Sequence, residues 1–509
     1  MSTSSRVIKN TAYLYIKMGI TIFISLYSTR LILASLGASD FGIFNVVGGA
    51  IAMLGFLNST LAHATQRFMS YAEGEGKMEK KRTIFNVSVV LHVIIAIVTV
   101  LLLLAAMYPL FNGVFNIESD RISAARIVYF CLIFSTVLTI INVPYDAVMN
   151  AHENMLYYSI IGIFESLLKL SVAFVCVYTN KDKLVVYGIL MACIPLITLT
   201  IMKVYCHRHY EECVIAPRRY WDGNMVKQIS GFFGWNFLTA ISSLFSAQGI
   251  GIVLNHFFGT VLNAAQGIAH QVNGALSNFS VNMMKALNPV IVKNAGAKNL
   301  DAMNRATLVG CKFSALLTMF FAIPLSLEVK YVLNLWLKEV PAWATTFVVL
   351  QLVQSIITQM ASSAATSVYG KGDIKHYAIW KSVTNTMPLF LSWLAFRLGG
   401  GPLWLYIPMI VVWAIGGDVI IIHFAKIKCG LNVSCYLRQV ILPLLGSTLL
   451  MLICGALSVV LLDEGFVRLL VTCMATSIGM LIAAWLFAIT KEEKTLLLGF
   501  VRGLIKRNK

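Results

Sequence analysis

Charge is scarce along this 509-residue chain, because Asp, Glu, Lys and Arg make up only 12% of it while 58% is hydrophobic. Long polar segments are missing as well, since the longest connection between apolar runs is the 23-residue stretch 206–228. These two absences exclude a large soluble domain within the chain. The mean hydropathy of +0.78 is typical of a polytopic membrane protein.

Several chemical motifs are also missing. The ten cysteines are scattered without a CxxC or Cys/His cluster, which argues against a zinc site or a disulfide framework. No glycine-rich phosphate loop is present, so direct ATP hydrolysis is not expected. We expect a protein that is not an enzyme and that holds no cofactor.

What the sequence does contain is a series of apolar runs, each long enough to cross a hydrocarbon core about 30 Å thick. They predict an all-α, polytopic integral membrane protein with about fourteen transmembrane helices. The predicted spans are 10–33, 41–64, 84–110, 122–148, 157–178, 184–205, 229–254, 257–287, 307–327, 346–369, 377–397, 403–424, 438–461 and 466–489.

The formal net charge of +18 is distributed unevenly between the connections. Basic residues gather in alternate connections, as in the segments 77–82, 206–228 and 293–305, whereas the opposite connections are short and poorer in cations. This asymmetry follows the positive-inside rule with both termini cytoplasmic, and it requires an even number of spans. We therefore attribute the charge to membrane topology and expect no nucleic-acid partner.

A weak internal repeat relates the two halves at an offset of 222 residues. This offset aligns Gly37 with Gly259 and Gly74 with Gly296, and hydropathy, loop length and loop charge agree at the same offset. Because it spans six helices, the halves have parallel topology. The prediction is two pseudo-symmetric six-helix lobes, at 1–220 and 221–425, followed by two C-terminal helices at 426–490. The tail 491–509 is predicted to form a cytoplasmic amphipathic helix on anionic membrane lipids.

A stripe of polar side chains follows one face of the predicted eighth span. Its members are spaced three or four residues apart and cover about 25 Å at the rise of an α-helix. A shorter stripe follows in the tenth span. Amides and hydroxyls donate and accept hydrogen bonds, so the stripes suit a cavity for sugar or water, or helix–helix contacts. The candidate lining residues are Asn263, Gln266, His270, Asn273, Ser277, Gln351 and Thr358.

Charged residues within the spans are the second group of candidates, because a charge at the bilayer centre costs about 3 kcal/mol on insertion scales. The cations are Lys17, Arg30, Lys169, Lys285 and Lys381. They either face an inter-lobe cavity or, near helix ends, extend to the headgroups. Their excess over acids suits a cargo with negative charge, such as a diphosphate, whereas an exporter of organic cations needs the opposite balance.

Three acids lie among these cations. Glu165 stands four residues before Lys169, the favourable order for an ion pair within one helix. Asp146 and Asp418 are the candidates for coupling to a proton or sodium gradient, and the alternative is that each neutralises a cation across the bundle.

Three segments resemble bacterial polysaccharide (O-antigen-type) flippases of the multidrug/oligosaccharidyl-lipid/polysaccharide (MOP) exporter superfamily. They are "KNTAYLYIKMGITIFISLYSTRLILASLGASDFGIF", "AHENMLYYSIIGIFESLLKL" and "LNLWLKEVPAWA". The resemblance implies alternating-access transport of an undecaprenyl-diphosphate-linked oligosaccharide across the bacterial cytoplasmic (inner) membrane, for surface polysaccharide such as the O-antigen of lipopolysaccharide. It also implies a cationic cavity, with Lys17, Arg30 and Lys169 as candidates in the first lobe, and a monomer that works with glycan biosynthesis proteins.

Two alternatives remain at this stage. One is a multidrug exporter or a lipid II flippase of the same superfamily. The other is a membrane glycosyltransferase or polymerase, which usually needs a sizeable extramembrane loop with catalytic acids or arginines, and the chain has no such loop.

Overall fold

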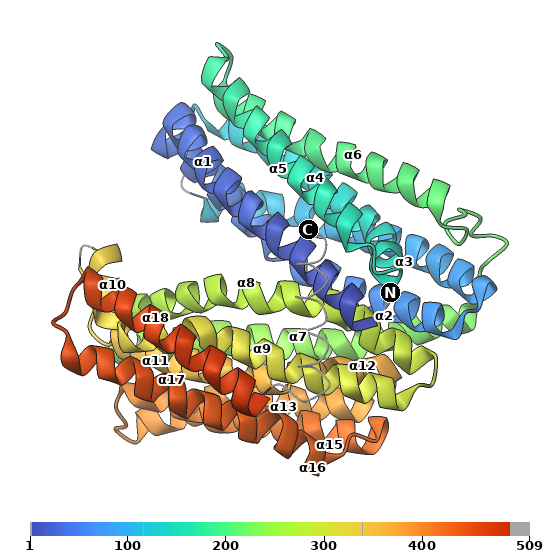
Figure 1. Ribbon diagram of the computed structural model, residues 1–509. Coiled ribbons are helices and arrows are strands. Elements are labelled where there is room, and N and C mark those ends of the chain that lie inside the picture. Colours follow the sequence, from blue (N-terminus) through green and yellow to red (C-terminus); the bar gives the residue numbers. More distant parts are fainter. Residues whose placement is uncertain (1–2, 116, 338, 489–509) are drawn as a thin grey trace, which may run out of the picture. The chain divides into compact units, whose positions relative to one another are not determined.

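The computed structural model describes residues 3–488 apart from 116 and 338, and these described residues fold into helices and short connections (Figure 1). The predicted amphipathic tail lies outside them. Long helices are the expected solution for apolar segments, since a spanning backbone must satisfy its hydrogen bonds internally. By its internal packing the chain divides into two compact units, Met1–Ala240 with Val292–Asn299, and Ile241–Ile291 with Leu300–Lys509.

The first unit is built mainly from α1 to α6, which run alongside one another (Figure 1). A kink at Gly37, with φ of 78°, divides α1 into two parts. The bounds are α1 Thr3–Ala52, α2 Gly55–Glu75, α3 Met78–Pro109, the π-helical turn η1 Leu110–Val114, α4 Ile122–Ala151, α5 Met155–Tyr178 and α6 Lys183–His209. The first part of α7 (Gly223–Phe258) and the last residues of α8 (Thr260–Gly296) also belong to this unit.

An arginine joins three helices at one end of the first unit. Arg121, just before α4, donates from Nε to Asp40 of α1 at 2.9 Å and from Nη1 to Asp182 at 2.8 Å. Asp182 also caps α6 by accepting from the backbone N–H of Val185. Arg121 lowers the pKa of Asp182 although burial opposes this shift, so the three helix ends are held by charge as well as by packing.

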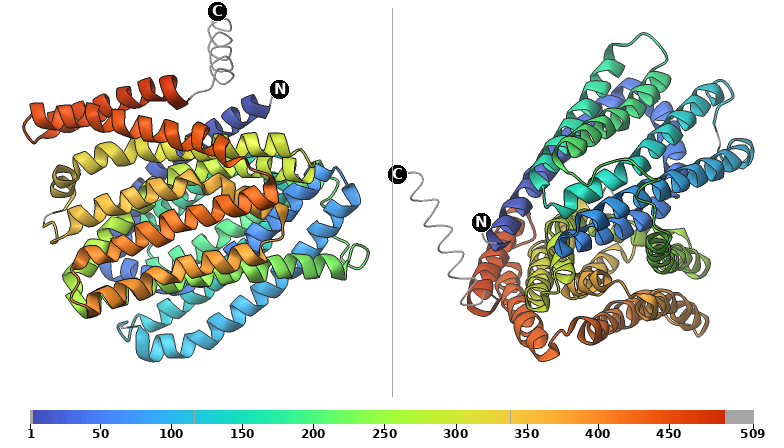
Figure 2. Two further views of the ribbon diagram at one scale, coloured as in Figure 1. Left: turned by 90° about the horizontal axis from the view of Figure 1, so that it is seen from below. Right: turned by 90° about the vertical axis from the view of Figure 1, so that its right-hand side faces the viewer.

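The second unit contains the rest of α7 and α8 and the helices that follow. Its last two helices, α17 and α18, pack on each other as an antiparallel pair (Figure 2). The bounds are α9 Leu300–Leu327, α10 Val329–Trp336, α11 Ala344–Met360, α12 Ser362–Lys371, α13 Lys375–Arg397, η2 Pro402–Leu405, α14 Tyr406–Pro408, η3 Met409–Gly416, α15 Gly417–Cys429, α16 Val433–Tyr436, η4 Leu437–Ile441, α17 Leu442–Leu461, α18 Phe466–Ala483 and η5 Ala484–Ala488.

The helices account for the predicted spans. Ten stretches of the described chain are long and apolar enough to cross a membrane, and two bent pairs, 39–75 and 344–371, add one span each. Both α8, with 37 residues, and α13, with 23 residues, are also long enough. Their polar side chains make both helices less apolar than the ten stretches. When α8 and α13 are added to the ten stretches and the two bent pairs, the number of spans is the expected fourteen. The chain is therefore an all-α, multi-pass membrane protein.

The predicted repeat has a counterpart in the backbone. Gly37 and Gly259, which the offset of 222 aligns, both have φ of 78° at a break between consecutive spans. Such left-handed conformations strongly favour glycine. The same helical break thus recurs at the same place in each half. The proposed lobe boundaries at 220 and 425 stay a prediction.

Candidate functional site

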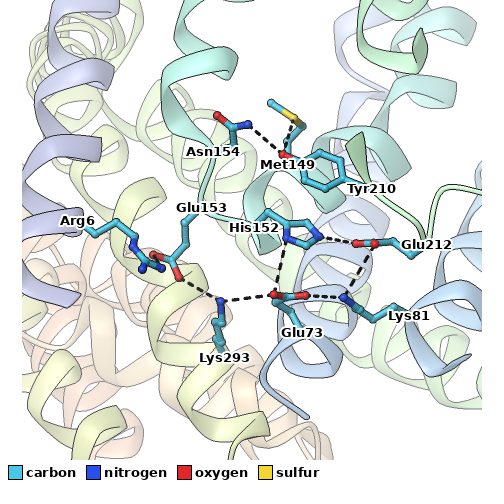
Figure 3. Close-up of polar contacts among 10 residues, drawn as sticks. All are labelled: Arg6, Glu73, Lys81, Met149, His152, Glu153, Asn154, Tyr210, Glu212 and Lys293. Carbon is cyan, nitrogen blue, oxygen red and sulfur yellow. Dashed lines mark hydrogen bonds and ion pairs between the residues drawn. The ribbon is translucent and has the colours of Figure 1, made fainter. Parts of the chain in front are cut away.

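A histidine between two carboxylates forms the centre of a charged network in the first unit (Figure 3). His152 Nε2 lies 2.5 Å from Glu212 Oε1, and His152 Nδ1 lies 3.7 Å from Glu73 Oε1. The Glu212 side chain is only 2% exposed. A buried carboxylate needs such partners, because an isolated one is very costly to remove from water.

Cations surround these acids. Lys81 Nζ lies 2.9 Å from Glu73 Oε2 and 4.0 Å from Glu212 Oε2. Lys293 Nζ lies 3.6 Å from an oxygen of Glu73 and 3.6 Å from an oxygen of Glu153. Arg6 reaches the other oxygen of Glu153 at 3.8 Å. We call Arg6, Glu73, Lys81, His152, Glu153, Glu212 and Lys293 the charged network.

Local backbone structure brings these side chains together. The network lies at the end of the unit where α2, α4, α6 and α8 end and where α1, α3 and α5 begin. Glu153, in the turn between α4 and α5, has φ of 56°, a left-handed conformation that is costly for a side chain other than glycine. This turn directs His152 toward Glu212 and Glu153 toward Arg6 and Lys293 (Figure 3).

Neighbouring polar and aromatic groups fix this turn. Asn10 of α1 donates to the backbone oxygen of Glu153 at 3.0 Å. Asn154 caps α5 by accepting from the N–H of Tyr157, and its amide donates to the Tyr210 hydroxyl at 3.0 Å. The Tyr210 ring stacks on His152 with 4.3 Å between centroids. The orientation of His152 is therefore set by hydrogen bonds and by stacking.

The network is built for ion pairing rather than for a metal. Glu73, His152 and Glu212 place ligand atoms within 4.8 Å of one another, a set that by residue type fits a divalent cation. However, Lys81 stands 2.9 Å from Glu73 and competes electrostatically with such a cation. Burial acts to raise the pKa of Glu212, but the hydrogen bond and charge of His152, together with Lys81, lower it on balance. Glu212 is thus a carboxylate that its own neighbours already satisfy.

Lys17, the cation near the middle of the first predicted span, is half-buried in the contact between α1 and α5. Its Nζ is 4.2 Å from the centroid of the Tyr158 ring. Gly162 makes room for it, since a Cβ there would lie 2.1 Å from Lys17 Cε. Tyr158 also hydrogen-bonds to Lys17 and lies within electrostatic range of Asp146 and Glu165. Lys17 therefore has acids from α4 and α5 nearby, which its own helix did not reveal.

The other candidate charges of the first unit differ from Lys17. Lys169 forms the predicted pair with Glu165 at 2.6 Å, with side chains 44% and 39% exposed. Arg30 is exposed. The structure thus brings Lys17, Glu165 and Lys169 to one face of α5 and leaves Arg30 open to other partners.

The polar stripe of α8 divides into buried and open members. Gln266 and Ser280 are buried, and Ser280 shares a 2.8 Å hydrogen bond with Thr318 of α9. His270 is exposed, and Asn263, Asn273 and Ser277 are half-buried. Within the described chain, the Asn273 amide oxygen has no hydrogen-bond partner. One end of the stripe thus holds helices together, and Asn273 retains a free acceptor.

Two further candidates lie in α11. The Gln351 amide donates to Gln354 at 3.2 Å and its oxygen accepts from the Tyr406 hydroxyl at 3.4 Å. The Thr358 hydroxyl donates to the Ser355 carbonyl of its own helix. Gln351 is therefore buried among neutral partners, while Thr358 is half-buried.

The remaining charges of the second unit are paired or partnered. Lys381 of α13 and Asp418 of α15 interact electrostatically. Gly417 permits this approach, because a Cβ there would lie 2.5 Å from Lys381 Nζ. Lys285 is half-buried on α8 and also interacts with a neighbouring group.

Sequence reasoning missed several residues. Lys312, in the predicted span 307–327, is only 2% exposed, and a lone lysine in a span was a signal for it. Arg67 lies just beyond the predicted span 41–64, with its guanidinium 4.8 Å from the Tyr71 ring and 5.7 Å from the Phe232 ring. The charged network was missed because its members are far apart in sequence. The one local signal of the network in the sequence is the His152–Glu153 pair. It lies in a connection between two predicted spans, on the side of the membrane where basic residues dominate the connections.

Comparison with known proteins identifies the fold. No family model and no curated protein sequence matches the chain. Solved structures of MATE proteins do match, among them one in the bent conformation, with a TM-score of 0.74, 13% identity and coverage of 84% of this chain and 95% of that one. An outward-facing multidrug resistance MATE family transporter of the MOP superfamily gives a TM-score of 0.69, at 13% identity with coverage of 84% and 95%.

A third match is a MOP superfamily transporter from Pyrococcus furiosus Vc1, for which a reversed polarity of the binding pocket suggests a different function. Its TM-score is 0.66, at 14% identity with coverage of 85% and 96%. The chain therefore has the fold of the MATE transporters of the MOP superfamily.

Proposed function

We propose that this protein is a flippase that moves an oligosaccharide linked to undecaprenyl diphosphate across the bacterial cytoplasmic membrane by alternating access. The fold is one that transporters use. One observation carries the proposed choice of cargo: each acid predicted within the spans lies beside a lysine or beside a tyrosine that contacts one. Such acids are poorly placed to bind a cationic drug.

The three acids support this point individually. Glu165 pairs with Lys169, and Asp418 interacts with Lys381. Asp146 lies near Tyr158, which contacts Lys17. The five candidate cations thus outnumber the three candidate acids, and a diphosphate headgroup would supply the missing negative charge.

Neutral groups of the second unit suit the glycan. The exposed ring of His270 can bond to sugar hydroxyls. We propose that α8 lines the path of the sugar while the cations of the first unit meet the diphosphate. Asn263, Gln266, Ser277, Gln351 and Thr358 are proposed as the supporting lining.

The proposed cellular setting follows from charge distribution. The basic connections support a proposed topology with both termini in the cytoplasm. A proton or sodium gradient, acting on Asp146 or Asp418, is the proposed driving force, and no cofactor is required. The protein is proposed to work as a monomer with glycan biosynthesis proteins.

The experiment is complementation of cells that lack their own flippase and need this protein for surface glycan. Lys17→Gln and Arg30→Gln should each reduce surface display, and the double variant should lose most of it, because an anion would lose its partners. Lys17→Arg should retain display. The control is Lys181→Gln, at an exposed lysine in the connection between α5 and α6. Normal display in the double variant would rule out the cation site.

The fold likeness favours one alternative, a multidrug exporter, because a matched structure is a multidrug resistance transporter. The same cells distinguish it. Drug resistance without glycan display identifies the exporter, and rescue of cell-wall synthesis identifies a lipid II flippase.

A further inference from the structure

The end of α8 occupies an unusual place in the packing of the chain. Of the described residues after Ile241, only the segment Val292–Asn299 groups with the first unit. This segment belongs to the second half of the predicted repeat. It follows directly on a helix whose earlier part, up to Ile291, belongs to the second unit.

Two glycines let this segment approach α2 at backbone contact. A Cβ on Gly74 would lie 1.9 Å from the carbonyl oxygen of Lys293, and a Cβ on Gly296 would lie 2.0 Å from the carbonyl oxygen of Tyr71. The offset of 222 residues relates Gly74 to Gly296 and Tyr71 to Lys293. The contact is therefore reciprocal, because each glycine meets the carbonyl at the position that the predicted offset pairs with the other contact.

A single side chain adds charge to this crossing. Lys293 is the member of the segment Val292–Asn299 that takes part in the charged network (Figure 3). Its Nζ lies 3.6 Å from Glu73 and 3.6 Å from Glu153. Each acid has a second cation within the first 240 residues: Glu73 has Lys81 at 2.9 Å, and Glu153 has Arg6 at 3.8 Å. The acids thus keep a partner when Lys293 leaves.

We propose that Lys293 and the Gly74–Gly296 crossing form a releasable tie, which holds the end of α8 against α2 in one transport state and opens in another. The proposal rests on the proposed transport function. Its physical basis is the asymmetry of the charges. The Lys293 side chain is 32% exposed and can return to water, whereas the Glu153 side chain is 4% exposed and keeps the charge of Arg6 at 3.8 Å as its second ion pair.

The remaining groups of the network supply a fixed base for the tie. His152 and Glu212 pair at 2.5 Å, and Lys81 bridges Glu73 and Glu212. These contacts join α2, α3, the α4–α5 turn and the α6–α7 connection without using α8. Release of Lys293 is therefore a local event at the end of α8.

The test measures distance between spin labels in the purified full-length protein in lipid nanodiscs. The labels are placed at Glu79 and Lys298, both exposed, in a background without the ten native cysteines. Lys293→Gln should raise the long-distance population about fivefold, the order expected for one partly exposed ion-paired lysine. Lys293→Arg should keep the parent distribution, and Lys227→Gln, at an exposed lysine of α7, is the matched control.

A second variant opens the crossing by packing alone. Gly296→Ala should shift the distribution in the same direction, because its Cβ collides with the Tyr71 carbonyl. An unchanged distribution in Lys293→Gln overturns the proposal, and so does an equal shift in Lys227→Gln. Should Lys293→Gln insert poorly, Glu153→Gln is measured instead and must produce a shift toward long distances.

This result is independent of the cargo, because the distances are measured without substrate. If Lys293→Gln shifts the spin-label distances but neither the parent protein nor any variant supports glycan display, the tie is supported and the proposed cargo is rejected. Distances that do not respond while the parent protein supports display reject the tie alone.

Discussion

The two units of the molecule satisfy their polar groups by different chemistry. The first unit relies on charge, with the charged network at one end and the Arg121 cluster at another. The second unit relies largely on neutral hydrogen bonds, such as those among Gln351, Gln354 and Tyr406. The matching glycine breaks at Gly37 and Gly259 show a shared backbone feature. The two units thus share a backbone feature at these glycines while the chemistry of their polar side chains differs.

The largest effect is expected where the second unit departs from its neutral chemistry. Glu328, whose side chain is fully buried, accepts from Arg468 at 3.0 Å and from Thr472 at 2.9 Å. Glu328→Gln leaves Arg468, whose side chain is only 13% exposed, without its counter-ion and should lower the free energy of unfolding in detergent by about 3 kcal/mol. Glu464→Gln, which removes an exposed pair with Lys330 at 3.7 Å, should change almost nothing. Similar losses in both variants would contradict this reading of Glu328.

The next effect concerns the charged network of the first unit. Glu212→Gln removes the carboxylate that pairs with His152 and should cost about 2 kcal/mol at pH 7, because hydrogen bonds to charged groups are the strong ones. Denaturant titration in detergent measures it. Glu211→Gln at the adjacent position is the control, and a loss of stability there as large as in Glu212→Gln would count against the network.

The same residue gives a pH dependence with a defined sign. The pKa of Glu212 is lowered below its ordinary value of 4.5 by its partners. Its contribution to stability is therefore complete above that value and is lost as the pH falls through the lower pKa of the folded protein. The free energy of unfolding is measured from about pH 3 to about pH 6, a range around the ordinary glutamate pKa. It should fall more steeply toward acid in the parent protein than in Glu212→Gln. Parallel curves would contradict it.

A smaller effect is expected for a neutral cluster of the second unit. Asn385 donates to Ser243 at 2.8 Å and accepts from the Trp413 indole at 2.8 Å. Asn385→Ala should cost about 1 kcal/mol, as interhelical hydrogen bonds in membranes usually do. The control is Thr386→Val, whose hydroxyl bonds to its own helix at the Ser382 carbonyl. If Asn385→Ala lowered the free energy of unfolding more than Glu212→Gln does, the proposed difference between the two units would be wrong.

The smallest effect is expected for a charged pair that is open. Glu165 and Lys169 stand 2.6 Å apart but are more than a third exposed. Glu165→Gln should change the free energy of unfolding by less than about 0.5 kcal/mol. A larger loss would show that this pair is structural in the same way as the charged network.

Much of the architecture could be predicted from sequence, and much of the site could not. The predicted spans 10–33 and 346–369 correspond to real helical spans, although the second is bent by 42°. The pair between Glu165 and Lys169 was predictable because both residues lie on one helix at a spacing of four. The acids near Lys17 were not, because Asp146 lies on another helix and its approach depends on helix rotation and register.

The hydropathy pattern was sufficient to show that the chain spans a membrane many times and where most of its helices lie. These properties depend on the hydropathy and spacing of neighbouring residues, which are local. The three-dimensional packing was needed to show that His152 meets Glu73 and Glu212, residues 79 and 60 positions away, and that Gly74 meets the backbone of α8. Such contacts depend on differences of about an ångström in helix packing, because hydrogen bonds and ion pairs weaken steeply with distance.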